Sequence, residues 1–302
     1  MNERPAAWAA VVINYESGSV LLDCVRALRA DQSAGPMEIV VVDNGSTDGS
    51  IDALRAADPD VSVLQPGANL GYGRAANLGI AATSAPIVAV VNPDAFVAPG
   101  SARVVVDAFA ADADLAVIGP RIVNPDGSVY PSARIAPGVV VATGHALLGG
   151  VLPHNRFTTR YRALDADPDR ARDVDWVSGA ALWFRREFLD RVGGWDERYF
   201  MFLEDVDVCR ELRRHGGRVR FEPGAEVIHV VGTSREGAPI RSIVRHHRSA
   251  YRYVDKWWTG PQRLALPLAA TFLAGRGTVV ALANGLRTSR RRGRPETSAA
   301  SG

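Results

Sequence analysis

The chain has 302 residues, of which 47% are hydrophobic, enough for one large α/β domain with smaller additions. Its two cysteines, Cys24 and Cys209, exclude a small secreted fold held together by a disulfide framework. The first segment, Met1–Ala7, is polar and contains no apolar signal sequence, which indicates a cytoplasmic protein.

The net charge of +2 conceals an uneven distribution of charge. From Arg241 onward, 12 Lys and Arg residues stand against only Asp255 and Glu296, so the preceding part carries a net charge of −8. An acidic body repels phosphate chains, and no basic surface interleaved with aromatic residues or DNA-reading motif appears. We therefore expect no nucleic-acid partner.

Strand and helix patterns alternate through the first part of the chain. Short apolar runs predict buried strands, and the amphipathic segments between them predict helices. The expected strands are 8–15, 38–43, 61–64 and 87–91, and the expected helices are 20–30 and 51–57. This order predicts an α/β fold with a doubly wound, mostly parallel sheet and right-handed crossovers.

Polar residues gather at the carboxyl ends of these strands. Ligands bind at that edge of an open α/β sheet, so the pattern predicts a nucleotide-diphosphate site. The glycine-rich segment 67–79 lets the backbone approach a ligand, but it lacks the spacing of a dinucleotide fingerprint or a P-loop. The candidate donor-binding residues are Asn14, Tyr15, Asp43, Asn69, Gly71, Arg74, Asn77, Asn92 and Asp94.

An Asn-Pro-Asp sequence ends the fourth expected strand. Asn92 and Asp94 are two positions apart, so both can point the same way from an extended segment. A carboxylate there is a natural ligand for Mg²⁺ or Mn²⁺, which are often shared with the phosphates of a substrate. The alternative interpretation is an ordinary turn at the end of a strand.

The middle of the chain has weaker patterns. Residues 136–172 are rich in Gly, Arg, Asp and Pro and predict a mobile loop or short hairpin. In the next segment, 174–184, the candidates for ligand binding are Trp176, Ser178 and Gly179. The face of a tryptophan suits the C–H surface of a sugar, although a tryptophan packed in the core is the alternative.

Three carboxylates, Glu204, Asp205 and Asp207, lie within four residues directly after an aromatic run. The apolar residues before them predict partial burial, and desolvation raises the pKa of a carboxyl group towards that of a useful base. The start of a helix, expected over 204–215, acts in the opposite direction because it favours the ionised form. Alternatively, these acids only cap and charge-match the helix.

The last part of the chain predicts a membrane-associating extension. Residues 240–258 carry arginines at helical spacing, and residues 264–286 are apolar but interrupted by proline, by glycines and by the central Arg276. A charge at the middle makes a spanning helix costly. Short apolar pieces with tryptophans and basic flanks favour a segment lying on the anionic cytoplasmic leaflet. An ordinary helical hairpin packed on the domain is the alternative.

The chain resembles the inverting nucleotide-sugar glycosyltransferases of the GT-A fold, of the family 2 type. Within that family it is most similar to bacterial dTDP-rhamnosyltransferases of actinobacterial cell-wall linker synthesis. The resemblance covers roughly residues 8–235. It rests on the order of the segments VVINY, VVDNGSTDGS, NLGYGRAANLGI, VNPD, SGAALWFRR, GGWDERYFMFLEDVDVC and AEVIHVVGTS.

The resemblance implies a domain organisation. A GT-A domain would comprise residues 1–238, with a nucleotide-sugar-binding half over 1–95 and an acceptor and catalytic half over 96–238. A basic amphipathic helical extension with a disordered tail would follow over 239–302.

The same resemblance implies roles for single residues. Asp43 would contact the nucleobase, and Asp205 stands where the family has its catalytic base. We interpret Glu204 as orienting either the acceptor or Asp205. Trp176, Ser178 and Gly179 would bind the acceptor, and the loop or hairpin expected over 136–172 would lie over the acceptor site. Asn92-Pro93-Asp94 stands where the family has its metal-binding Asp-x-Asp motif.

His229, in the apolar strand expected over 226–231, matches a family position that can complete the metal site. Without that resemblance, a lone histidine in such a strand is more often a packed or hydrogen-bonded residue.

The chain departs from the family pattern in two places. Asn92 replaces the first Asp of Asp-x-Asp, which shifts the weight of metal binding to Asp94, His229 and the diphosphate. Ala76 stands where many relatives have Arg; Arg74 could substitute for it, or could simply be an exposed loop residue. The Gln-x-x-Arg-Trp motif of processive synthases is missing, which favours addition of a single sugar.

The resemblance, together with an Arg-rich and Lys-poor composition, implies the substrates. L-Rhamnose would move from dTDP-rhamnose to N-acetylglucosaminyl-diphosphate-polyprenol at the inner face of the plasma membrane. One alternative is a transferase of the same fold that uses a UDP- or GDP-sugar on a polysaccharide or glycolipid. The other is a non-catalytic nucleotide-sugar-binding scaffold, against which the presence of Asp94, Glu204, Asp205 and His229 together argues.

Overall fold

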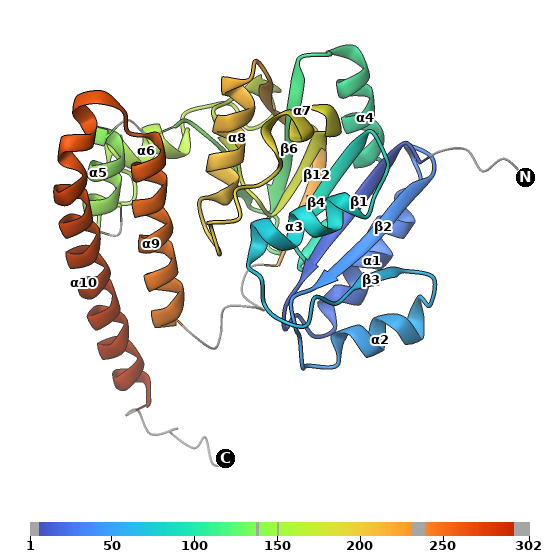
Figure 1. Cartoon of the computed structure of the whole chain (residues 1–302), viewed down its shortest axis with the longest axis horizontal. Helices are drawn as coiled ribbons and strands as arrows, with labels where there is room; N and C mark the ends of the chain where they lie inside the picture. The colour runs from blue at the N-terminus through green and yellow to red at the C-terminus, as the bar shows by residue number, and fades with distance from the viewer. Residues whose placement is uncertain (1–5, 137–138, 150, 231–238, 293–302) are drawn as a thin grey trace, which may run out of the picture. The chain divides into compact units, whose positions relative to one another are not determined.

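The computed structural model describes residues 6–136, 139–149, 151–230 and 239–292 (Figure 1). The chain divides into two compact units. The first comprises Met1–Phe200 with Glu204–Ser234, and the second comprises Met201–Leu203 with Arg235–Gly302. The end of the expected first domain at residue 238 and the tail beyond residue 292 lie outside the described residues.

A ten-stranded mixed sheet forms the centre of the first unit. Its main path has the order β3-β2-β1-β4-β11-β6-β12-β5, with β7 paired to β6 and β9 to β12, while β8 and β10 form a separate two-stranded sheet. The strands are β1 Trp8–Asn14, β2 Met37–Asp43, β3 Ser62–Leu64, β4 Ile87–Val91, β5 Ala95–Val97, β6 Leu115–Val123, β7 Val129–Tyr130, β8 Ala133–Arg134, β9 Arg172–Asp173, β10 Trp176–Val177, β11 Ala181–Arg185 and β12 Arg218–His229.

Helices cover both faces of the parallel part of the sheet (Figure 1). Side chains alternate along β1, so Trp8, Ala10 and Val12 lie in one core with α1, α2 and α4. Val11 lies on the other face, where a Cβ on Gly79 of α3 would come within 2.2 Å of its Cγ1. The predicted doubly wound α/β fold is confirmed. These helices are α1 Val20–Ala30, α2 Ser50–Ala57, α3 Tyr72–Ala81 and α4 Ser101–Ala111.

The second half of the sheet brings a distant segment beside β4. Strand β11 pairs antiparallel with β4 and with β6, and β6 pairs parallel with β12. The strand expected over 226–231 is the end of the much longer β12, whose pairing shifts register between Glu222 and Glu226. After that shift, His229 lies opposite Ala95 of β5.

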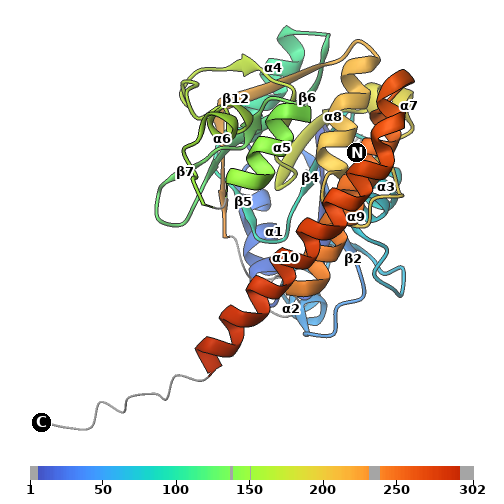
Figure 2. The same ribbon diagram turned by 90° about the vertical axis from the view of Figure 1, so that its left-hand side faces the viewer.

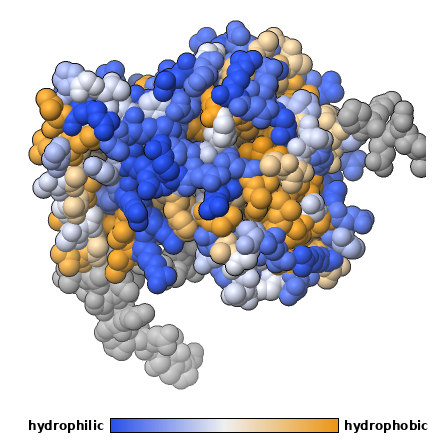
Figure 3. All heavy atoms as spheres, viewed as in Figure 1, coloured by the Kyte–Doolittle hydropathy of each residue, from blue (hydrophilic) through white to orange (hydrophobic). Residues whose placement is uncertain are grey.

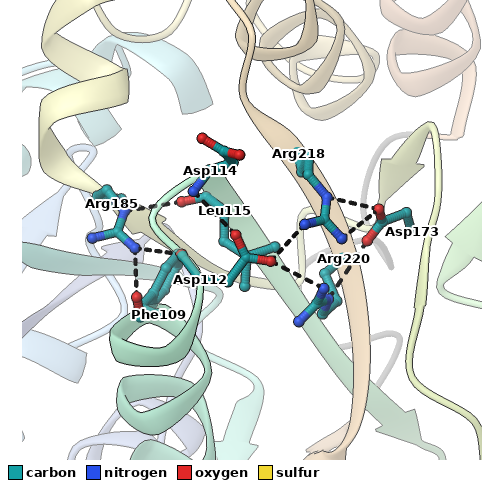
Figure 4. A network of polar contacts seen from close by, with 8 residues as sticks. All are labelled: Phe109, Asp112, Asp114, Leu115, Asp173, Arg185, Arg218 and Arg220. Atoms are coloured by element: carbon teal, nitrogen blue, oxygen red, sulfur yellow. Dashed lines mark hydrogen bonds and ion pairs between the residues drawn. The ribbon is translucent and has the colours of Figure 1, made fainter.

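A network of charged side chains fixes the end of the sheet far from His229 (Figure 4). Arg218, at the start of β12, forms ion pairs of 2.5 Å with Asp112 and 2.8 Å with Asp173. Arg220 contacts the same two carboxylates at 3.3 and 3.5 Å. Arg185 of β11 donates to the backbone oxygens of Phe109, Asp112 and Leu115 at 2.6 to 3.0 Å. These contacts tie β9, β11 and β12 to the end of α4.

Two helices occupy the segment that the sequence predicts to be a loop or hairpin, so that prediction is wrong (Figure 2). Asn155 caps the second helix, because its Oδ1 accepts from the backbone N–H groups of Phe157 and Thr158 at 3.0 and 3.1 Å. The two helices approach closely, since a Cβ on Gly144 would lie 2.4 Å from the Phe157 ring. The first of these helices, VVVATGHALL, is apolar on nearly all sides and therefore shows no amphipathic period in the sequence. The helices are α5 Val139–Leu148 and α6 Arg156–Arg162.

The second unit contains α9 Pro239–Trp257, a 3₁₀ segment η1 Gly260–Ala265, and α10 Leu266–Arg292. The interruption expected within 264–286 is not found, because α10 is continuous. Pro267 lies in its first turn, where the missing N–H removes no helical hydrogen bond. Residues Gly260–Leu282 are long and apolar enough to cross a membrane, and none of that stretch is buried.

Candidate active site

Asn14 and Asp43 end the neighbouring strands β1 and β2 and meet at the carboxyl edge of the sheet. Asn14 Nδ2 donates to Asp43 Oδ1 at 3.1 Å, and both side chains are buried. The Ser46 hydroxyl donates to the same oxygen at 2.5 Å. Asp43 Oδ2 receives only a long 3.4 Å hydrogen bond from Gln65 within the described residues. Asn14 therefore positions Asp43, and the following Tyr15 is exposed at the same edge.

Gly71 brings the start of α3 against the backbone before α8. Its φ is +85°, and a Cβ there would lie 2.5 Å from the carbonyl oxygen of Phe200. The Asn69 side chain accepts from the Gly71 N–H at 3.0 Å, and the Tyr72 N–H donates to Phe200 at 2.8 Å. Only glycine fits this close approach.

Asn77 and Arg74 on α3 face the loop that contains Trp195 and Glu197. Asn77 Oδ1 accepts from the Trp195 N–H at 2.8 Å, and its Nδ2 donates to the Trp195 oxygen at 2.9 Å. Arg74 is exposed and forms a 3.5 Å ion pair with Glu197. Both groups of the Asn77 amide are thus used to hold the loop, while Arg74 reaches solvent.

Asp94 and His229 are brought together by the ends of β4 and β12. The Val230 N–H donates to the Asp94 backbone oxygen at 2.9 Å, which places His229 Nε2 3.2 Å from Asp94 Oδ1. Asp94 is buried, with 7% of its surface exposed. Asn92 is half-buried, and its N–H donates to the Ala180 oxygen at 2.8 Å. A carboxylate and an imidazole in contact form a donor pair suited to a divalent metal ion.

Glu204 and Asp205 begin helix α8 Glu204–Arg214. Asp205 Oδ2 accepts from the Gly179 N–H at 2.9 Å, and its Oδ1 accepts from the Val206 N–H at 2.8 Å. Glu204 is buried, and its Oε2 has no hydrogen-bond partner among the residues that the structure describes. Asp205 is therefore held in one orientation, whereas Glu204 lies in surroundings that suit a neutral carboxyl group.

The two carboxyl groups differ in the contacts that counteract the effect of burial on their pKa. Burial raises the pKa of Glu204 from 4.5 to about 8, and the neighbouring charge of Asp205 adds to the shift. Burial also raises the pKa of Asp205, but the N–H groups of Gly179 and Val206 and the charge of Arg134 oppose that rise. Two adjacent carboxyl groups cannot easily ionise together. We conclude that Asp205 ionises first while Glu204 keeps its proton.

The residues directly before α8 have an unusual backbone. Phe202 and Leu203 have φ values of +71° and +63°, although neither is glycine. This left-handed conformation costs energy in residues with a side chain, and such strain is concentrated at functional sites. The aromatic run in the sequence does not reveal it, because the φ values depend on how the chain turns into the helix.

Tyr72 shows that the acids converge on one place. Burial raises the pKa of Tyr72 well above its usual value, and the charges of Glu204, Asp205 and Asp94 add to the shift in that order. The Tyr72 hydroxyl donates to the Gly179 oxygen at 2.9 Å. Tyr72 thus contacts Gly179, whose N–H holds Asp205. The next residue, Ala180, accepts from the N–H of Asn92, two residues before Asp94. The segment 179–180 therefore connects the candidate base with the end of β4 that leads to Asp94. Tyr72 was missed from the sequence because a tyrosine in a glycine-rich segment has no specific pattern.

The three candidates for the acceptor side fall on one short segment. Gly179 directly holds Asp205, and a Cβ there would lie 3.2 Å from the Asp205 Cβ. Ser178 is half-buried, and its N–H donates to the Ser132 oxygen at 2.9 Å. Trp176 is buried, with 5% of its surface exposed, and lies opposite Arg134 in the β8–β10 pair. The core position that the sequence left open for Trp176 is therefore the observed one.

Comparison with known sequences places the chain in a family. The sequence pattern described as "Glycosyltransferase like family 2" matches residues 5–251. The chain is similar to an N-acetylglucosaminyl-diphospho-decaprenol L-rhamnosyltransferase of Mycobacterium tuberculosis, with 39% identity over 85% of this chain and 88% of that protein.

Solved structures share the fold. A structure of GalNAc-T7 with UDP, GalNAc and Mn²⁺ matches 87% of this chain with a TM-score of 0.61 and 16% identity. This chain spans only 50% of that one. A mannosyltransferase from Pyrobaculum calidifontis in complex with GDP-Man and Mn²⁺ matches 95% of this chain and 80% of its own, with a TM-score of 0.56 and 17% identity.

Proposed function

The chain belongs to the glycosyltransferase-like family 2, and we propose that it transfers L-rhamnose from dTDP-rhamnose to N-acetylglucosaminyl-diphosphate-polyprenol. The observation that supports this choice of substrates is the 39% identity to the mycobacterial L-rhamnosyltransferase over 85% of the chain. The type of reaction is supported by Asp205, which Gly179 holds, and by the Asp94–His229 pair. The N–H of Asn92, near Asp94, donates to Ala180, the residue after Gly179.

Asp205 is the general base in this proposal. A hydroxyl oxygen of the acceptor attacks the anomeric carbon of rhamnose, the bond from that carbon to the diphosphate oxygen breaks, and dTDP leaves with the bonding electrons. The hydroxyl proton passes to Asp205, which the Gly179 and Val206 N–H groups hold in place. One in-line displacement inverts the anomeric carbon and needs no covalent intermediate.

Glu204 has a different role because it keeps its proton at neutral pH. Its buried carboxyl group adjoins Asp205, and it has a proton to donate. We assign Glu204 to orienting the acceptor or the Asp205 carboxylate. Two carboxyl groups with different protonation states can hold a hydroxyl group between them and accept its proton on one side.

Asp94 and His229 would hold a divalent ion, Mg²⁺ or Mn²⁺. One carboxylate oxygen and one imidazole nitrogen, 3.2 Å apart, suit such an ion. Among the described residues, no three His, Cys, Asp or Glu side chains form a metal site, so the donor diphosphate would supply further ligands. When bound, the ion neutralises negative charge on the phosphate oxygens.

The donor nucleotide would lie along the carboxyl edge of β1, β2 and β4. Within the described residues, Asp43 Oδ2 accepts only the 3.4 Å hydrogen bond from Gln65, so it would accept a hydrogen bond from the nucleobase. Tyr15 is exposed beside it. The backbone from Asn69 to Gly71 comes close to the edge without side-chain bulk. Asn14 and Asn77 support this site from behind through their own protein contacts.

The second unit would hold the enzyme at the inner face of the plasma membrane, where a polyprenyl acceptor lies. On α10 and just before it, large apolar side chains face outward (Figure 3). Leu264 is 86% exposed and Leu268 is 73% exposed. Apolar side chains flanked by arginines favour binding at an anionic bilayer surface.

The first test is a calorimetric titration with dTDP, UDP and GDP, each with and without Mg²⁺ or Mn²⁺. We expect metal-dependent binding that favours dTDP, followed by transfer of rhamnose to the lipid acceptor with inversion. A preference for UDP or GDP, or transfer of another sugar while dTDP-rhamnose stays inert, would overturn the proposed donor. Binding of none of the three would revive the non-catalytic alternative.

A further inference from the structure

Arg134 lies in a cluster of aromatic rings on the acceptor side. Its guanidinium carbon is 4.8 Å from the centre of the Trp176 ring and 5.5 Å from the centres of the Tyr130 and Tyr161 rings. Its Nη2 donates to the Tyr130 hydroxyl at 2.6 Å, and its Nε donates to the Pro131 oxygen at 3.1 Å. A planar guanidinium held among rings keeps one orientation, so little entropy is lost when it binds an anion.

No carboxylate within the described residues forms an ion pair with Arg134, although the residue is half-buried. Two other half-buried arginines are paired, Arg121 with Asp169 and Arg220 with Asp112. Arg185 is also without a carboxylate partner in the described residues, but it donates to three backbone oxygens, whereas Arg134 donates to one.

Arg134 Nη2 donates to the Tyr130 hydroxyl, and the Tyr161 hydroxyl is a second side-chain partner, so the side-chain partners of Arg134 in the described part of the chain are neutral. A partly desolvated cation whose partners are all neutral is costly unless an anion completes it.

Arg134 also lies close enough to the catalytic base to affect it. Its charge helps to hold down the raised pKa of Asp205 and opposes the rise that burial causes in the pKa of Tyr161. The link is structural, because Trp176 of β10, which stacks on Arg134, is followed three residues later by Gly179, which holds Asp205. Arg134 is therefore joined through β10 to the segment that holds the catalytic base.

We propose that Arg134 binds the phosphate attached to the acceptor sugar and so selects acceptors that carry a diphosphate. This inference rests on the proposed function for the identity of the acceptor. The acceptor hydroxyl must reach Asp205, and the anomeric phosphate lies across the same sugar ring. A cation on the segment that also holds the base is in a position to bind that phosphate.

The donor diphosphate is the other anion in the reaction, and the stereochemistry argues against it as the partner of Arg134. In an in-line displacement, the leaving group departs from the face opposite the attacking hydroxyl. The base lies on the attacking side, and Arg134 acts on that base. The leaving diphosphate would instead be bound at the Asp94–His229 pair.

The test compares two soluble acceptors that have the same sugar and the same octyl tail. One is N-acetylglucosaminyl-diphosphate-octyl, and the other is the neutral octyl N-acetylglucosaminide. In Arg134→Gln we expect the preference in kcat/KM for the diphosphate acceptor to fall about 10- to 100-fold. Arg134→Lys, which keeps the charge without the stacking plane, should be intermediate. Using the ratio cancels any effect of Arg134 on Asp205, which both acceptors share.

Arg191→Gln is the matched control, because Arg191 also stacks on an aromatic ring, Phe188, at 4.6 Å, but lies on the separate helix α7 Arg186–Val192. It should leave the ratio unchanged. An unchanged ratio in Arg134→Gln, in a variant that melts within a few degrees of the native protein, would show that Arg134 only packs the cluster.

A second measurement separates this inference from the proposed function. Binding of N-acetylglucosaminyl-diphosphate-octyl is followed by tryptophan fluorescence with saturating dTDP and Mn²⁺ present, since Trp176 stacks on Arg134. If the native enzyme transfers no rhamnose but binds this probe, and Arg134→Gln binds it at least about 10-fold more weakly, the proposed donor is wrong and the phosphate site stands. If the native enzyme does not bind the probe, the phosphate site is refuted.

Discussion

Asp205 receives two backbone hydrogen bonds, from Gly179 and Val206, and these fix both its carboxylate oxygens. Asparagine has nearly the same shape but cannot accept a proton from a hydroxyl group. We expect Asp205→Asn to lower kcat at least about 100-fold, because general-base catalysis contributes that much or more. Nucleotide affinity in calorimetry should stay the same.

The matched control for this change is Asp207→Asn, two residues further along α8. The Asp207 carboxylate accepts from the Tyr199 hydroxyl at 3.2 Å and supports the fold. We expect this variant to be less stable but to keep most of its turnover. An Asp205→Asn enzyme with native turnover would refute the assignment of the base.

Glu204 makes the stability of the protein depend on pH. Its pKa rises from 4.5 to about 8 on folding because it is buried, so the folded state binds its proton more tightly than the unfolded state. The stability from this proton is complete below pH 4.5 and is lost as the pH rises towards 8. Glu204→Gln has no such proton, so its free energy of unfolding should gain about 1 to 3 kcal/mol relative to the native protein across that range.

Chemical unfolding at several pH values measures this difference, and its change with pH is the relevant quantity. The absolute stability also depends on whether the amide finds partners beside Oε2. Glu187→Gln, at an exposed position on α7, should show no comparable trend. A difference that stays constant from pH 5 to pH 8 would mean that Glu204 is ionised in the folded protein.

At the scale of elements, Gly71 is the point where α3 meets the chain before α8. Its φ of +85° and ψ of 172° lie in a region that only glycine enters readily, and a Cβ would lie 2.5 Å from the Phe200 oxygen. We expect Gly71→Ala to lower the free energy of unfolding by about 2 to 4 kcal/mol and to impair transfer. Thermal and denaturant unfolding would measure the first effect.

Gly100 offers a close comparison, because it also precedes a helix and has a φ of +89°. A Cβ there meets nothing within 4 Å, and its ψ of −14° is compatible with a left-handed residue. Gly100→Ala should therefore cost only about 1 kcal/mol and leave transfer intact. Equal losses in the two variants would show that φ alone matters and that the contact with Phe200 does not.

The elements differ in how far the sequence could predict them. Strand β4 was predicted with its bounds because its five residues are all buried, which leaves an unbroken apolar run. Helix α5 was missed because its sequence, VVVATGHALL, is apolar on nearly all sides and has no amphipathic period. Helix α6 was missed because it has only seven residues and depends on its Asn155 cap, and so short a segment shows no clear period of 3.6 residues.

The candidate site was predictable to a similar degree. Asp94 and Asp205 stand directly at the ends of recognisable elements, so their position in the sequence indicates chemistry. Arg134 lies on a two-residue strand and Tyr72 in a glycine-rich segment, so neither has a recognisable sequence pattern. Their contacts with Trp176 and Gly179 form only when β8, β10 and α3 pack together. The sequence predicts the acids, whereas the groups that tune and surround them come from tertiary contacts.

At the scale of the whole molecule, the chain separates its chemistry from its proposed attachment to the membrane. All the proposed site residues lie in the first unit, and the long apolar helix α10 lies in the second. Within the second unit, Arg276 Nη1 lies 2.9 Å from His247 Nε2 of α9, so the central charge of α10 is directed at its partner helix. The outward face of α10 is thereby left apolar at Leu268 and Leu282.

Removing all residues after Trp258 should therefore release the protein from membranes without abolishing donor binding. The deletion removes α10 and the basic end but keeps α9 and the whole first unit. We expect the truncated protein to lose sedimentation with anionic phosphatidylglycerol vesicles and to keep its affinity for dTDP. Transfer to a soluble octyl acceptor should survive, whereas transfer to an acceptor embedded in vesicles should fall sharply.

A full-length variant with Leu264, Leu268 and Leu282 changed to serine distinguishes the causes of release. Release of this variant would indicate that the apolar face of α10 binds the bilayer, whereas retention would assign binding to the basic residues. Unchanged sedimentation of the truncated protein would refute the role of α10 and leave α9 as the attachment.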